Sequence, residues 1–105
     1  MPPKRARPRD LGSNWPEESI SDAAGEVARL LAIALRDTID GISLRRASNL
    51  TGVDHVTIAD ILRGDSWPDL ITIARLEAGL ETTLWPCGLA ARVATGKAAD
   101  GPEGP

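Results

Sequence analysis

The chain has 105 residues, with 12 basic and 15 acidic side chains and a formal net charge of −3 at pH 7, and this length allows one small domain. It contains no apolar run of about 18 residues, which argues against a membrane span, and its first residues lack the apolar segment of a secretory signal. One cysteine, Cys87, and one histidine make neither an internal disulfide nor a credible zinc site. We therefore expect a cytoplasmic protein without cofactor or metal, in which Cys87 is a small, half-buried side chain.

Residues 1–19 are dominated by Pro, Gly, Ser and charged side chains, a composition typical of a flexible arm. Trp15 stands apart in this segment. It is either a staple onto the first helix or an anchor for a partner, and the sequence does not separate the two. The arm begins with four positive charges, which are Lys4, Arg5, Arg7 and Arg9.

The first helix is predicted to start at Asp22, with Ser19 or Ser21 beside it, and to end near Asp40 and Gly41. Its apolar side chains recur at steps of three and four residues, as on one face of a helix. This stripe comprises Val27, Leu30, Leu31, Ala34, Leu35 and Thr38. The acids expected to face away from the core are Asp22, Glu26, Asp37 and Asp40.

Residues 43–64 read as two short helices joined by a tight turn. Ser43 and Asp54 are predicted to cap the two helices, because each offers a side-chain oxygen to free backbone N–H groups. Gly52 stands in the turn, where a positive φ is expected, and Gly64 is the expected C-cap of the second helix. The apolar residues that hold the second helix in the core are Val53, Ile58, Ile61 and Leu62.

Asp69 is predicted to cap a fourth helix, and Trp67 before it and Trp85 after it are expected in the core as bulky packing units. The apolar residues of this helix are Leu70, Ile73, Ala74, Leu76 and Ala78. Residues 82–95 leave two alternatives open, a fifth helix or an extended stretch. We expect residues 87–105 to form a short helix or a disordered tail.

The pattern from Ser43 to Gly64 closely resembles the helix-turn-helix of the phage repressor and Cro family, the lambda-repressor-like DNA-binding domains. The resemblance extends from about Asp22 to Pro86, and its later part is similar to a branch common in actinobacteria and their phages. It implies an all-α fold, a bundle of four or five helices over residues 20–86. It further implies a transcriptional repressor on the nucleoid, which binds double-stranded DNA as a homodimer with half-sites ~10 bp apart.

The resemblance places helix 55–63 in the major groove of a palindromic operator. It implies that His55 donates to guanine or phosphate, Val56 packs on a thymine methyl and Asp60 accepts from a cytosine amine. The alternative for Asp60 is a surface ion pair with Arg63 or Arg46. The positions implied to read bases are His55, Val56, Thr57 and Asp60.

Phosphate contacts are expected from the first turn of the preceding helix, whose N–H groups point outward, and from arginines at both ends of the motif. The basic arm either lies in a minor groove, where negative potential attracts arginine, or is a solvated tail. The phosphate-contacting positions are Ser43, Leu44, Arg45, Arg46 and Arg63.

Charge supports a second class of function. Residues 21–86 contain six arginines against ten acids, a net charge of −4, whereas most DNA-binding domains are basic. The alternative is a protein-interaction module on a helix-turn-helix fold, antitoxin-like or an antirepressor. No phosphate loop or catalytic set of side chains indicates an enzyme. Leu84 and Trp85 either form the dimer contact or, with Trp85 folded onto the first helix, close the monomer core.

Overall fold

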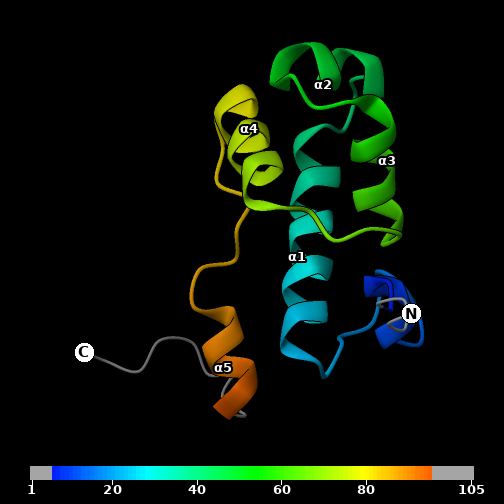
Figure 1. Ribbon diagram of the computed structural model, residues 1–105, viewed down its shortest axis with the longest axis vertical. Coiled ribbons are helices and arrows are strands. Elements are labelled where there is room, and N and C mark those ends of the chain that lie inside the picture. The colour runs from blue at the N-terminus through cyan, green and yellow to red at the C-terminus, as the bar shows by residue number, and fades with distance from the viewer. Residues whose placement is uncertain (1–5, 96–105) are drawn as a thin grey trace, which may run out of the picture.

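The computed structural model describes residues 6–95, which contain helices and no strand, so the all-α prediction is confirmed (Figure 1). A short 3-10 helix precedes five α-helices. The elements are η1 (Pro8–Leu11), α1 (Ala23–Thr38), α2 (Leu44–Thr51), α3 (His55–Arg63), α4 (Leu70–Leu80) and α5 (Leu89–Thr95).

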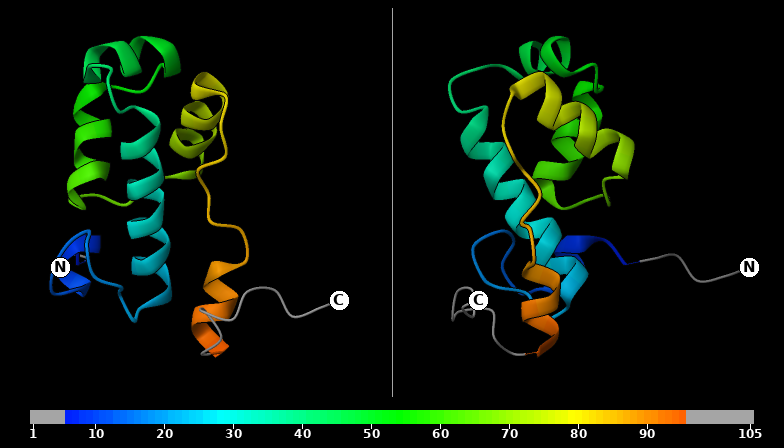
Figure 2. Two further views of the ribbon diagram at one scale, coloured as in Figure 1. Left: turned by 180° about the vertical axis from the view of Figure 1, so that it is seen from behind. Right: turned by 90° about the vertical axis from the view of Figure 1, so that its left-hand side faces the viewer.

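The central element is α1, which contacts η1, α3 and α5 along its length. Helix α2 lies across the C-terminal end of α1 and contacts α3 and α4 (Figures 1 and 2). The core fills the space that these helices enclose, and its most completely buried large side chains are Leu31, Leu35, Ile58 and Leu76. No helix in residues 6–95 is long and apolar enough to cross a bilayer.

Helices α1 to α4 each begin after a residue whose side chain accepts a hydrogen bond from a backbone N–H of the first turn. These residues are Asp22, Ser43, Asp54 and Asp69, as predicted. Such caps stabilise a helix by about 1 kcal/mol each, because they satisfy N–H groups that have no intrahelical partner.

The N-terminal segment differs from the predicted flexible arm. Residues 6–20 are folded against α1 and the end of α3, with Pro8 and Ile20 buried (Figure 2). A few apolar side chains in a polar composition are enough to dock the segment. Lys4 and Arg5 lie outside the described residues.

A buried ion pair holds this segment on α1. Arg29 donates to both carboxylate oxygens of Glu26 at 2.7 Å. The same carboxylate accepts from the Ile20 amide at 2.9 Å, and Arg29 donates to the Pro16 carbonyl at 3.0 Å. The hydrogen bonds from Arg29 lower the pKa of Glu26 against the opposing effect of burial. The prediction that Glu26 faces solvent is therefore wrong, because its carboxylate joins α1 to the preceding segment.

The chain after α4 follows an irregular path over residues 81–88 and then forms α5. Glu77 fixes the start of this path, because its Oε2 accepts from the amides of Leu84 at 2.7 Å and Trp85 at 3.0 Å. These bonds lower the pKa of Glu77. For residues 82–95 the sequence left a fifth helix or an extended stretch open. In the structure the first part of this segment is non-helical and the last part is a short helix.

Candidate nucleic-acid interface

The turn between α2 and α3 consists of three residues, 52–54. Gly52 has a φ of 75°, in the left-handed region that favours glycine, which confirms the predicted turn. Val53 points into the core, and the Asp54 carboxylate accepts from the Val56 amide at 3.2 Å to start α3. At the far end Gly64, with a φ of 72°, is the predicted C-cap. Local residues thus fix both ends of α3.

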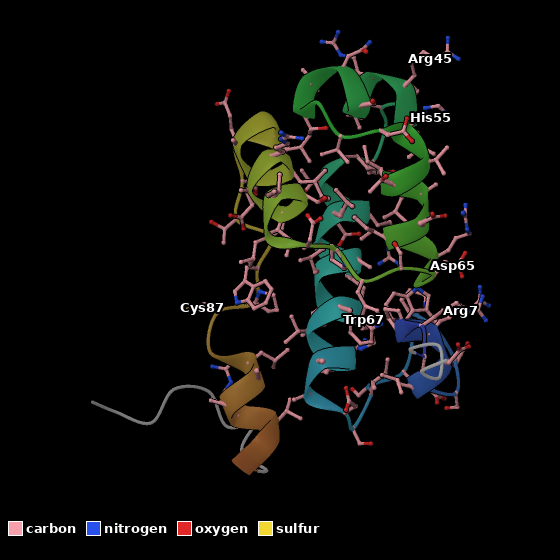
Figure 3. All side chains as sticks on the ribbon, in the orientation of Figure 1. Arg7, Arg45, His55, Asp65, Trp67 and Cys87 are labelled. Atoms are coloured by element: carbon pink, nitrogen blue, oxygen red, sulfur yellow. The ribbon has the colours of Figure 1, made fainter. Side chains whose placement is uncertain are left out.

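Helix α3 has a buried side and an exposed side. Ile58 and Ile61 are buried in the core, as predicted. His55 is exposed at the start of the helix, Val56 is 52% exposed and Thr57 is half-buried (Figure 3). Asp60 is half-buried like Thr57, so all four residues predicted to read bases are at least partly accessible to solvent.

The start of α2 presents two arginines. Arg45 and Arg46 are exposed, and neither guanidinium pairs with a carboxylate of residues 6–95 (Figure 3 labels Arg45). The Ser43 hydroxyl accepts from the Arg46 amide at 3.0 Å, and Leu44 packs against the core. We call the surface formed by Arg45, Arg46, His55, Val56 and Thr57 the α2–α3 face.

Asp60 and Arg63, both predicted to contact DNA, are instead joined to each other. Arg63 donates to Asp60 Oδ1 and, at 2.9 Å, to Asp65. This is the surface pair that the sequence left as the alternative for Asp60. Because Arg63 bonds to one of its two oxygens and opposes its charge, Asp60 is a weaker acceptor for a cytosine amine.

The arginines of the N-terminal segment are also paired within the chain. Arg7 lies 3.0 Å from Asp10 and 3.2 Å from Asp65, and Arg9 lies 3.4 Å from the same Asp65 oxygen (Figure 3 labels Arg7 and Asp65). The hydrogen bond from Arg63, with Arg9 beside it, lowers the pKa of Asp65. Arg7 and Arg9 therefore are not the free charges that the minor-groove prediction assumed.

The N-terminal segment caps the end of α3. The Trp15 indole donates to the Leu62 carbonyl at 2.9 Å, and the Arg9 amide donates to the Gly64 carbonyl at 3.0 Å. The Leu62 carbonyl lies in the last turn of α3 and Gly64 is its C-cap, so neither carbonyl has a donor within the helix. The indole ring also covers Gly64, so Trp15 is neither of the two predicted alternatives: it packs on α3.

Leu84 cannot form the predicted dimer contact. It is 3% exposed and belongs to the core, because the hydrogen bonds to Glu77 turn it inward. Trp85 is 43% exposed and Trp67 is half-buried, so neither indole fills the core as predicted. Trp67 donates to the Ala6 carbonyl at 2.8 Å.

Two further residues are more exposed than predicted. Cys87 is exposed rather than half-buried. Leu70 is 79% exposed and Ile71 62% exposed at the start of α4, where the sequence placed Leu70 on the core side. The described part of the chain holds no cluster of three or more His, Cys, Asp or Glu side chains suited to a metal ion.

No family model matches the chain, and no curated protein or solved structure matches it at a significant level. These comparisons supply neither a family nor a ligand for the α2–α3 face. What this face binds is therefore inferred from its residues and their geometry.

Proposed function

We propose that the protein is a sequence-specific DNA-binding transcriptional regulator, a repressor of the lambda-repressor-like type, which binds double-stranded DNA through the α2–α3 face. One observation carries the proposal: α3 keeps Ile58 and Ile61 in the core and exposes His55 and Val56 beside the arginines of α2. A helix about 10–12 Å across, held by one side only, fits a major groove about 12 Å wide.

The exposed residues divide into two roles on this proposal. Arg45 and Arg46 contact phosphates, because their charge is not opposed by a carboxylate of the described chain. Val56 packs on a thymine methyl, and His55 and Thr57 form hydrogen bonds to bases or phosphates. Asp60 is left out of base reading, because Arg63 holds its carboxylate.

Two copies bind a palindromic operator on this proposal, with half-sites ~10 bp apart. Of the predicted dimer contact only Trp85 is exposed, so the copies are held together mainly by the shared operator. Binding of this kind places the protein on the nucleoid in the cytoplasm.

Binding-site selection from a random duplex library, followed by fluorescence anisotropy at fixed salt, tests the proposal. We expect an enriched palindrome that binds at least about 10³-fold more tightly than a scrambled duplex. Val56→Ala should relax the preference at one position of each half-site and leave the fold intact. A library without enrichment after repeated rounds would refute sequence-specific binding.

The alternative, a protein-interaction module on the same fold, is favoured by one observation. Leu70 and Ile71 form an exposed apolar pair at the start of α4 and are not among the residues assigned to DNA. On this alternative the selection yields no motif, and Leu70→Asp abolishes complex formation with a protein partner while Val56→Ala does not.

A further inference from the structure

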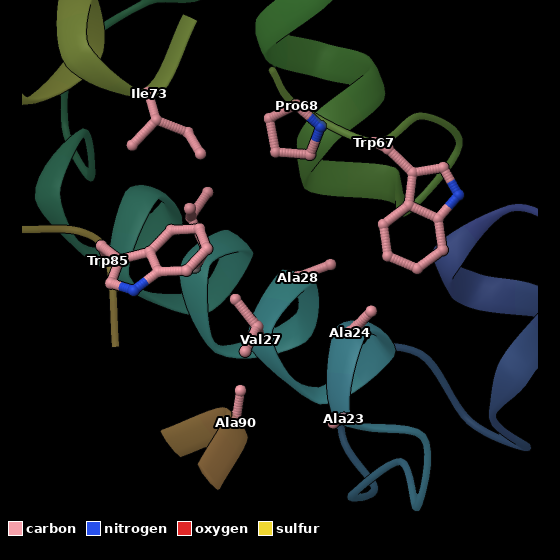
Figure 4. Close-up of a pocket in the computed structure, with 10 residues that line it drawn as sticks. Ala23, Ala24, Val27, Ala28, Trp67, Pro68, Ile73, Trp85 and Ala90 are labelled. Carbon is pink, nitrogen blue, oxygen red and sulfur yellow. The ribbon is translucent and has the colours of Figure 1, made fainter. Parts of the chain in front are cut away.

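An apolar cavity of about 400 Å³ lies beside α1, outside the α2–α3 face. Figure 4 shows Trp85 and Trp67 on opposite sides of it, with Val27 and Ala28 of α1 between them. Ile73 of α4, Pro68 of the loop before α4 and Ala90 of α5 border its other sides. The ten lining residues are Ala23, Ala24, Val27, Ala28, Leu31, Trp67, Pro68, Ile73, Trp85 and Ala90.

The lining determines the chemistry of an occupant. None of the ten side chains carries a charge, and four of them are alanines that leave the space open. The indole N–H of Trp67 already donates to the Ala6 carbonyl, which leaves the indole N–H of Trp85 as the one side-chain donor among the ten lining residues. A charged molecule would lose its hydration here without compensation, whereas an uncharged apolar molecule gains by leaving water.

The size of the cavity argues for a small molecule over a protein. Its volume falls within the range of about 300–1,000 Å³ that is usual for small-molecule sites. The indole rings of Trp67 and Trp85 border it on two sides and offer aromatic surface, against which a flat, aromatic molecule packs well.

We propose that this cavity, which we call the indole cavity, is a binding site for a small, uncharged, planar apolar molecule. The proposal does not depend on DNA binding, because none of its residues belongs to the α2–α3 face. The segments outside the described residues offer few side chains that could fill the cavity. Residues 96–105 contain no apolar side chain larger than proline, and the apolar side chains of residues 1–5 are Met1 and two prolines.

Titration of the full chain with N-phenylnaphthylamine, an uncharged aromatic dye that brightens in apolar sites, tests the proposal. We expect saturable binding of one dye per chain. Ala90→Phe and Ala24→Leu, which add bulk at exposed alanines lining the cavity, should weaken binding by about tenfold or more. The matched controls Ala91→Phe and Ala74→Leu, at exposed alanines outside the lining, should change it less than about twofold.

Nuclear magnetic resonance of the three indole N–H groups gives a second readout that does not require a variant. Dye should shift the signals of Trp67 and Trp85, which line the cavity, and leave that of Trp15 in place. Absence of saturable binding, or equal effects of the cavity variants and their controls, would overturn the proposal. It would also be overturned if a chain without residues 1–5 and 96–105 bound the dye about tenfold more tightly, because the chain's own ends would then be the occupant.

Discussion

Ile58 packs α3 into the core together with Ile61, and it has no exposed surface. We expect Ile58→Ala to lower the free energy of unfolding by about 2–4 kcal/mol, since the deleted methylene and methyl groups leave a cavity. Urea denaturation followed by circular dichroism measures the change. Val56→Ala, on the exposed side of the same helix, is the control and should cost less than about 0.5 kcal/mol. Equal losses would mean that the two sides of α3 are wrongly assigned.

Glu77 makes stability depend on pH. Because the amides of Trp85 and Leu84 bond to its carboxylate, its pKa is lowered in the folded state. Its contribution is therefore present above the unfolded pKa of about 4.3 and is lost as pH falls through the lower folded pKa. Glu77→Gln should reduce stability near neutral pH and make the decline toward acid shallower than in the wild type.

Denaturation midpoints measured at a series of pH values below neutrality test this prediction. Glu81→Gln, at the end of the same helix, controls for the removal of one negative charge. A Glu77→Gln variant whose midpoints decline as steeply as those of the wild type would show that the two amide bonds do not govern acid sensitivity.

Local contacts of single residues could be predicted from the sequence, and distant ones could not. Asp54 caps α3 because the amide that it accepts from is two residues away. Trp15 bonds to a carbonyl 47 residues away and Arg7 to a carboxylate 58 residues away, and no periodicity encodes such partners. The ion pair of Asp60 with Arg63 could be predicted as one of two alternatives, because Arg63 stands one turn along the same helix.

At the level of elements, the two left-handed glycines that flank α3 should differ in their tolerance of a side chain. At Gly52 an added Cβ meets nothing within 4 Å, so Gly52→Ala costs only the left-handed strain, about 1–2 kcal/mol. At Gly64 the Cβ would lie 2.6 Å from the Trp15 ring, so Gly64→Ala must also displace the indole. We therefore expect Gly64→Ala to have the lower thermal midpoint of the two.

Fluorescence of Trp15 distinguishes left-handed backbone strain from displacement of the indole ring. A Trp67→Phe, Trp85→Phe background isolates its emission, which should shift on Gly64→Ala and remain unchanged on Gly52→Ala. If both substitutions lowered stability equally and left the emission unchanged, the packing of Trp15 on the end of α3 would be wrong.

Helices α1 to α4 were predictable because apolar periodicity and caps are local signals. The folded N-terminal segment was not, since its composition is that of an arm and its docking depends on Pro8 and Ile20 meeting α1. Leu70 follows the apolar pattern of α4 but stands at its first position, beyond the reach of the core.

At the scale of the whole molecule, pairing within the chain removes Arg7 and Arg9 from the charge available to DNA. The basic side chains of residues 1–5 are Lys4 and Arg5. Because their removal deletes two positive side chains, we expect it to reduce the slope of log affinity against log salt by at most about 2. Anisotropy titrations at several salt concentrations give the slope. A further reduction, to a total near 4, when residues 1–9 are removed would mean that the internal ion pairs open on DNA and that Arg7 and Arg9 are engaged as well.

The central claim, that the α2–α3 face binds DNA, is tested most directly by the affinity of three single variants for the selected duplex over a range of salt. Arg45→Ala and Arg46→Ala remove charges that no carboxylate of the described chain opposes, whereas Arg36→Ala removes an equal charge that is paired with Asp37 on α1. We predict that the first two each weaken binding and reduce the salt slope by about 1, and that Arg36→Ala leaves both near the wild-type values. The same loss in all three variants, or in none, would contradict the claim.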